Sequence, residues 1–153
     1  MQRTSRFRPA TESDVDAVIG MMRGYYAEDG YPFVEPDARR AVATLIRDER
    51  VGRLWVADDG GRVVGYLAVT LGFSLEYHGL DAFLDEVFLA AGSRGRGLGR
   101  EALETAEQYC RERGVKALHL EVERHRDGAL ALYRRVGFED HNRFLMTKRL
   151  DTT

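Results

Sequence analysis

The hydrophobic positions of the chain recur with two different periods. Apolar residues at helical spacing predict four helices, over residues 11–28, 36–46, 98–113 and 126–136. Apolar runs and alternations predict seven strands, over residues 5–9, 54–57, 63–71, 82–89, 115–122, 138–140 and 143–148. Two helices lie early, a hairpin follows, and a strand-helix-strand-helix-strand order ends the chain. That order predicts a mixed α/β sheet with helices on both faces.

One stretch joins a predicted strand, a turn and a predicted helix without a break. The turn contains three glycines and two arginines in six residues, Arg94-Gly95-Arg96-Gly97-Leu98-Gly99, and Arg100 follows at the start of the helix. The first N–H groups of a helix lack internal partners, and the helix dipole places partial positive charge there. The stretch therefore predicts a binding site for an anion such as phosphate.

Three kinds of phosphate-binding turn can be compared with this stretch. The P-loop requires a Gly-Lys-Ser/Thr ending, which the turn lacks. The dinucleotide fingerprint requires glycine at its sixth position, where counting from Gly95 gives Arg100. The pattern Gln/Arg-x-x-Gly-x-Gly/Ala fits residues 94–99.

Composition limits the remaining choices. The 153 residues suffice for one domain with its own core, and we assign residues 1–153 to a single domain. A net charge of −2 argues against nucleic acid as a partner, and no apolar run is long enough to span a membrane. The single cysteine, Cys110, and the absence of a signal-like N-terminal segment favour a cytoplasmic location. We expect no metal.

The segments around the turn resemble those of one family. The stretch 94–99 looks like the acetyl-CoA signature of the GNAT superfamily of N-acetyltransferases. The preceding strand, the helix ending near Gly114 and the segment 129–138 (ALALYRRVGF) are similar to the family's consecutive segments, in the same order. The resemblance implies one N-acetyltransferase domain with a twisted, mostly antiparallel mixed sheet of six to seven strands and about four helices on both faces.

The resemblance also implies which residues hold acetyl-CoA. The strand before the turn would pair with the pantetheine through backbone groups of Val87, Phe88 and Leu89, and the N–H of Leu89 would face the thioester carbonyl. The pyrophosphate would lie on residues 94–100, namely Arg94, Gly95, Arg96, Gly97, Leu98, Gly99 and Arg100. Many members have asparagine seven residues before a tyrosine, and here Arg126 stands at that position. A guanidinium donates but does not accept hydrogen bonds, so the contact there differs.

Direct transfer of an acetyl group requires an acid for the departing thiolate and an acceptor for the amine proton. The resemblance implies that Tyr133 is the acid, and a phenol is protonated at neutral pH. Asp85 and Glu86 are the candidates that deprotonate or hold the amine. Strict alternation would place Glu86 with Leu84 on one face of the strand and Asp85 on the other. We expect His119 and Glu121, near the end of the next strand, to line the same cleft, and His119 is a further candidate base because imidazole titrates near neutral pH.

The sequence says less about the molecule that accepts the acetyl group and about the oligomeric state. The layout of residues 72–86 is similar to the diamine or polyamine acetyltransferase branch, and six acidic residues form a possible approach for cations: Glu28, Asp29, Glu35, Glu76, Asp81 and Asp85. We therefore expect a small-molecule cationic primary amine as acceptor. The alternatives are other amines, or a non-catalytic module that binds acyl-CoA as a sensor or partner-binding unit. A homodimer is possible by analogy with the family.

Overall fold

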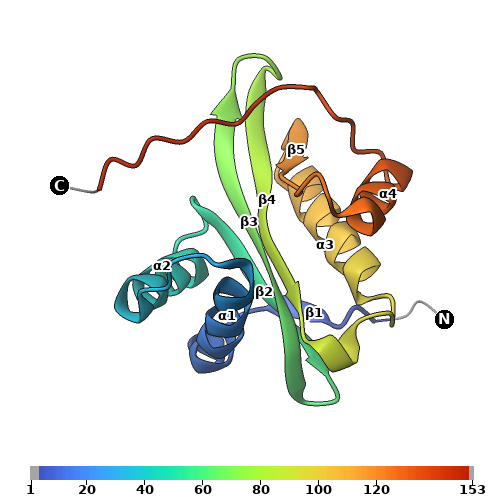
Figure 1. Ribbon diagram of the computed structural model, residues 1–153. Helices are drawn as coiled ribbons and strands as arrows, with labels where there is room; N and C mark the ends of the chain where they lie inside the picture. The colour runs from blue at the N-terminus through green and yellow to red at the C-terminus, as the bar shows by residue number, and fades with distance from the viewer. Residues whose placement is uncertain (1–3, 152–153) are drawn as a thin grey trace. The chain divides into compact units, whose positions relative to one another are not determined.

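The computed structural model describes residues 4–151. The chain divides into two compact units, one reaching to Glu121 and one beginning at Val122. The first unit holds a five-stranded sheet in the order β1-β2-β3-β4-β5 (Figure 1). Its strands are β1 (Phe7–Pro9), β2 (Gly52–Asp59), β3 (Arg62–Ser74), β4 (Gly79–Leu89) and β5 (Ala117–Leu120). The first three pairings are antiparallel and β4 pairs with β5 in parallel, which confirms a mixed sheet.

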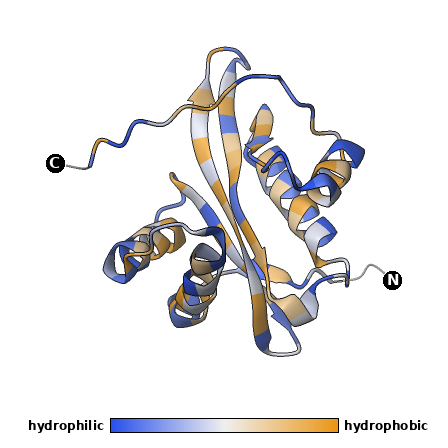
Figure 2. Ribbon diagram, in the orientation of Figure 1, coloured by the Kyte–Doolittle hydropathy of each residue, from blue (hydrophilic) through white to orange (hydrophobic). Residues whose placement is uncertain are grey.

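Helices cover both faces of this sheet, as the pattern predicts. Helices α1 (Val15–Asp29) and α2 (Glu35–Arg47) lie on one face, and α3 (Leu98–Glu112) lies on the other (Figure 1). Val18, Ile19 and Met22 of α1 pack against Tyr66 and other residues of the central strands. On the opposite face Trp55 of β2 meets Tyr109 of α3 edge to face at 5.0 Å. Figure 2 shows the matching run of hydrophobic residues along β3 and β4.

The second unit contains α4 (Asp127–Arg135), which gives the four α-helices expected. Val136 caps this helix, and Gly137 follows in a left-handed conformation with φ of 104°. The ring of Phe138 then folds back on Tyr133, with ring centroids 5.9 Å apart. Residues 129–138 therefore form most of α4, its C-terminal cap and an aromatic contact that folds back onto the helix.

The predicted number of strands is wrong within the described residues. Residues 138–140 and 143–148 form no strand there, although their apolar residues suggested two. Phe144, Leu145 and Met146 are instead exposed, at 88%, 65% and 89%. Apolar alternation predicts which side chains seek burial, but a strand also requires a neighbouring backbone that pairs with its N–H and C=O groups. Conversely, β3 and β4 extend beyond the prediction and close a long hairpin over residues 72–81.

Candidate functional site: an open strand edge leading into a helix start

The site begins where β4 and β5 part. The two strands pair only from Asp81–Ala117 to Leu84–Leu120, while β4 continues to Leu89 against β3 alone. The N–H of Ala90 donates to the carbonyl of Val64 beyond the end of β3's pairing with β4. Because backbone groups alternate along a strand, those of Leu89 and Val87 point away from β3, and those of Phe88 point towards it. Over the described residues, β4 therefore presents an edge that is paired with no neighbouring strand beyond Leu84, and its Leu89 carbonyl accepts from the side chain of Arg94.

A bulge in β4 marks the same point. Ala68 of β3 pairs with Glu86, but the next residue, Val69, pairs with Leu84, so Asp85 is an extra residue in β4. Cross-strand partners share a face, and Ala68 lies in the core under α1. Glu86 therefore faces α1, whereas Leu84 lies on the α3 face. The expectation that Leu84 and Glu86 share one face is wrong, because it assumed an unbroken alternation.

Glu86 is held by two tyrosines. The hydroxyl of Tyr26 on α1 donates to Oε2 at 2.5 Å, and that of Tyr66 on β3 donates to Oε1 at 2.7 Å. Burial raises the pKa of the Glu86 carboxyl above its usual range, while the two phenols act in the opposite direction. The same burial and the neighbouring carboxylate raise the pKa values of both phenols, so they remain donors. Helical periodicity places Tyr26 on the apolar face of α1 but does not predict this contact with a strand 60 residues away.

Asp85 differs from its neighbour. Its residue surface is exposed, since it projects from the bulge, yet the protein around it desolvates the carboxyl and raises its pKa. Two carboxyl groups therefore lie where β4 parts from β5: Asp85 in the bulge itself and Glu86 directly after it.

The turn after β4 has the geometry of an anion cradle. Gly95 and Gly97 have φ of 78° and 81°, a region that favours glycine, and Gly97 caps the N-terminus of α3. The first hydrogen bond within α3 runs from the N–H of Glu101 to the carbonyl of Gly97. The N–H groups of residues 98–100 therefore have no partner within the helix. A Cβ at Gly95, Gly97 or Gly99 would meet no atom within 4 Å, so the space over the turn is open.

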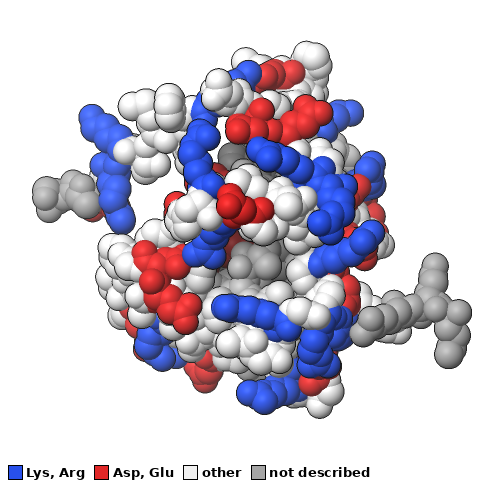
Figure 3. All heavy atoms as spheres, turned by 45° about the vertical axis from the view of Figure 1, so that its right-hand side comes forward, with Lys and Arg blue, Asp and Glu red and all other residues white. Residues whose placement is uncertain are grey.

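The arginines of the turn have partners in the protein. Arg94 Nε donates to the carbonyl of Leu89 at 3.1 Å, which ties the turn to the end of β4. Arg96 pairs with Asp59 at 2.8 Å, and Arg100 pairs with Glu104 of the same helix at 3.2 Å. Arg96 and Arg100 thus form ion pairs with carboxylates, whereas Arg94 forms a hydrogen bond with a backbone carbonyl. Basic and acidic side chains are interspersed on the surface drawn in Figure 3.

Arg6 supports the turn from the start of β1. Its guanidinium donates to the carbonyl of Arg96 at 2.9 Å and forms a close ion pair with Glu101 in the first turn of α3. Both side chains of this pair are largely buried, at 12% and 17% exposure. An acidic residue at a helix start is stabilised by the helix dipole, and the guanidinium balances its charge. Sequence reasoning did not single out Arg6, because its partner is 95 residues away.

Tyr133 and Arg126 belong to the second unit, where Arg126 caps the start of α4. Burial is the main cause that raises the pKa of the Tyr133 phenol, and the positive charge of Arg126 acts against it. The phenol is therefore protonated at neutral pH, as an acid requires.

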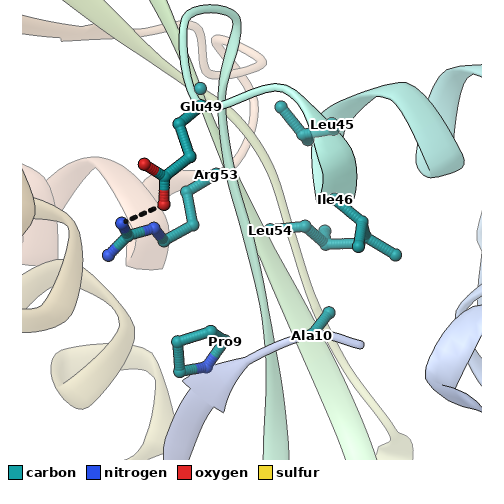
Figure 4. Close-up of a pocket in the computed structure, with 8 residues that line it drawn as sticks. Pro9, Ala10, Leu45, Ile46, Glu49, Arg53 and Leu54 are labelled. Carbon is teal, nitrogen blue, oxygen red and sulfur yellow. Dashed lines mark hydrogen bonds and ion pairs between the residues drawn. The ribbon is translucent and has the colours of Figure 1, made fainter. Parts of the chain in front are cut away.

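Other features lie away from β4. A hollow of about 180 Å³ lies between α2, β1 and β2, lined by Leu45, Ile46, Leu54 and their neighbours, with Arg53 and Glu49 paired at its rim (Figure 4). It contains none of the predicted site residues. Over residues 4–151, no His, Cys, Asp and Glu side chains gather in a group of three able to hold a metal ion. No helix in that range is long and apolar enough to cross a membrane.

Comparison with known proteins identifies the family. The model of the acetyltransferase (GNAT) family matches residues 19–138, so the chain belongs to this family. GNAT acetyltransferases use acetyl-CoA as the acetyl donor. The open edge of β4, the glycine turn and the start of α3 all lie within the matched residues.

Individual relatives agree with this assignment. The "IAA acetyltransferase" of Azospirillum brasilense is 31% identical over 131 residues, covering 84% of this chain and 81% of the relative. The N-acetyltransferase MJ1207 of Methanocaldococcus jannaschii is 27% identical over 141 residues, which is 90% of this chain but 62% of the relative's length. The integron cassette protein HFX_CASS3 from the Cole Harbour Salt Marsh metagenome has a TM-score of 0.85 and 36% identity, covering 97% and 92% of the two chains.

Proposed function

We propose that the chain transfers the acetyl group of acetyl-CoA to a primary amine, and that the acceptor is a small cationic amine. The observation that carries this proposal is the continuity of the open β4 edge with the glycine turn and the start of α3. A long cofactor with a pyrophosphate in its middle matches a free strand edge followed by an anion cradle.

In this proposal the acetyl donor lies along residues 87–89 and its pyrophosphate on residues 94–100. The N–H groups of Val87 and Leu89 pair with the pantetheine, and that of Leu89 stabilises the oxyanion as the amine attacks the thioester carbonyl. The residues present fit this group, because the space over Gly95, Gly97 and Gly99 is open. Arg126 donates to a cofactor oxygen in place of the asparagine found in many relatives of this family.

The acceptor chemistry follows from the carboxyl groups of β4. Asp85 and Glu86 lie at the opening where the thioester carbonyl would point, and negative charge there attracts a cationic amine. Tyr133 donates its phenolic proton to the thiolate that leaves. A polyamine or diamine is the first acceptor to test, by analogy with the similar layout of residues 72–86.

The experiment is release of the coenzyme A thiol from acetyl-CoA in the presence of diamines, amino acids, aminoglycosides and peptide amines. The proposal predicts amine-dependent release that is greatest for small cations. Tight binding of acetyl-CoA without release for any amine would instead indicate a sensor. Tyr133→Phe tests the acid: its turnover should fall, and turnover equal to that of the unchanged protein at every pH would exclude this role.

A further inference from the structure

A histidine and a carboxylate lie in contact where the pairing of β4 with β5 ends. Phe83 and His119 are cross-strand partners, one position before β4 and β5 separate. Phe83 pairs with Thr70, two residues from Ala68, so Phe83 and His119 lie on the face that also bears Glu86. His119 is therefore placed beside the opening, on the side of the sheet that α1 and α2 cover.

A carboxylate orients the ring of His119. Its Nε2 lies 3.2 Å from Oδ2 of Asp81, and the two side chains are 22% and 16% exposed. An N–H at Nε2 that donates to Asp81 leaves the lone pair on Nδ1, so the contact selects the tautomer able to accept a proton. A Cβ at Gly72 would lie 2.8 Å from Oδ1 of Asp81, so glycine leaves room for this carboxylate.

Aromatic rings flank the imidazole. The ring of Tyr77, from the β3–β4 turn, lies 5.3 Å from it, and that of Phe83 lies 5.1 Å from it, centroid to centroid. Phe83 is 37% exposed, so solvent or a ligand reaches this side of the pair. Among the contacts of residues 4–151, the ionisable groups beside the imidazole are the Asp81 carboxylate from β4 and the Tyr77 phenol from the turn. Such rings hold the imidazole in place and favour a cation in front of them.

Glu86 is less suited to accept a proton than this pair. Each of its oxygens already accepts a hydrogen bond from a tyrosine, at 2.5 and 2.7 Å. These two donors stabilise the ionised form of Glu86 and so weaken the attraction of its oxygens for a further proton. The imidazole of His119 keeps one nitrogen without such a donor in the contacts described, and a histidine exchanges protons readily near neutral pH.

We propose that His119, positioned by Asp81, takes the proton that the acceptor amine loses, directly or through one bridging water. The inference rests on the proposed function. The amine nitrogen forms its bond to the acetyl carbon, the bond from that carbon to sulfur breaks, and the thiolate takes its proton from the acid of the reaction. The proton from nitrogen passes to Nδ1 of His119 and then to solvent, while Asp81 and Glu86 remain carboxylates.

The test compares three variants of the full chain in acetyl transfer across pH. His119→Gln removes the proton acceptor, and we expect kcat to fall by about 10²-fold or more with the KM for acetyl-CoA unchanged. The acid limb of kcat/KM that belongs to an imidazole should disappear as well. His78→Asn is the matched control: His78 is exposed on the same hairpin with φ of 64°, a conformation that asparagine tolerates. It should retain the profile of the unchanged protein.

Asp81→Asn tests the positioning role. It should lower kcat while the KM for acetyl-CoA stays unchanged, whereas a merely structural residue would change stability alone. NMR of the ring nitrogens gives a readout independent of turnover: the proton of the neutral His119 ring should lie on Nε2 in the unchanged protein, and this preference should be lost in Asp81→Asn.

The outcomes separate this inference from the proposed function. Amine acetylation with an unchanged pH profile in His119→Gln would overturn the inference and leave the proposed function standing. The same tautomer of His119 with and without the Asp81 carboxylate would overturn the positioning role. Absence of acetyl transfer to every amine tested would refute the proposed function, and this inference with it.

Discussion

Leu84 and Glu86 lie on opposite faces of β4, although they are two residues apart and would share a face in a regular strand. The extra residue, Asp85, turns the chain over between them. The bulge coincides with the last pair that β4 makes with β5. One irregularity therefore opens the edge of β4 and also turns Glu86 towards the tyrosines of α1 and β3.

The first prediction concerns this buried carboxylate. Burial raises the pKa of Glu86 above its ordinary value of 4.5, so its ionised form is disfavoured in the folded protein. Protonated Glu86 therefore stabilises the fold below pH 4.5, and this stabilisation is lost as the pH rises through the pKa that Glu86 has in the folded protein. Glu86→Gln keeps an oxygen for one tyrosine and removes the charge. We expect its Tm, relative to that of the unchanged protein, to be higher at pH 8 than at pH 4.

Thermal unfolding at several pH values measures this effect, and Glu104→Gln on the exposed side of α3 is the control. The control should show no comparable trend. A relative Tm of Glu86→Gln that is lower at pH 8 than at pH 4 would mean that the tyrosines stabilise the charge by more than burial disfavours it.

The second prediction separates the fold of the glycine turn from its use as a cradle. Gly97→Ala places a side chain at φ of 81° and should lower stability by about 1–2 kcal/mol. Gly99 lies in the first turn of α3 without positive φ, and a Cβ there meets nothing. Gly99→Ala should therefore leave stability equal or slightly higher, yet weaken acetyl-CoA binding about tenfold, near 1.4 kcal/mol.

Calorimetric titration with acetyl-CoA and denaturant unfolding distinguish these effects. Unchanged affinity in Gly99→Ala would show that the cofactor phosphates do not approach this part of the turn.

The third prediction addresses Arg6. Arg6→Gln leaves the largely buried Glu101 without its guanidinium and frees the carbonyl of Arg96. We expect a loss of roughly 1–3 kcal/mol in the free energy of unfolding, as for other hydrogen bonds to charged groups. The KM for acetyl-CoA should rise because the turn is held less firmly.

The matched control is Arg111→Gln, whose partner Glu107 is four residues away on the exposed surface of α3. An exposed pair of this kind is worth about 0.5 kcal/mol or less. Equal effects of the two substitutions, on stability and on KM, would contradict a supporting role for Arg6.

The fourth prediction concerns Asp14, a buried carboxylate near the start of α1. Its hydrogen bonds from Arg8, at 2.8 and 3.1 Å, are the main cause that lowers its pKa from the ordinary 3.8, and the N–H of Thr11 adds to them at 2.8 Å. Because the pKa of Asp14 is lower in the folded than in the unfolded state, its carboxylate stabilises the fold at a pH above the unfolded-state pKa. This stabilisation is lost as the pH falls through the folded-state pKa. Asp14→Asn should cost roughly 1–3 kcal/mol at pH 7.

Denaturant unfolding of Asp14→Asn and the unchanged protein at pH 7 and pH 3 checks the sign. The difference between them should shrink at the lower pH. A difference that grows there would show that the ionised carboxylate is not the stabilising form.

The amino-acid sequence predicts most of the helices and the central strands because their apolar periods are regular. Gly97 and the start of α3 were predictable for the same local reason, since the turn and the helix start are continuous in sequence. The bulge at Asp85 was not predictable from the sequence. One extra residue leaves the apolar pattern of β4 almost unchanged, although it moves the side chains after it to the opposite face of the sheet. The contacts of Glu86 with Tyr26 and of Arg6 with Glu101 join residues 60 and 95 positions apart, which periodicity does not encode.

Acetyl transfer itself remains the central claim. Its most direct test is mass spectrometry of a small diamine incubated with acetyl-CoA and the full chain, with Gly99→Ala as a variant that keeps the fold. The account predicts a singly acetylated diamine whose rate of formation falls in Gly99→Ala at limiting acetyl-CoA. Acetyl-CoA bound by the chain, with no acetylated product from the diamine or any other amine, would contradict it.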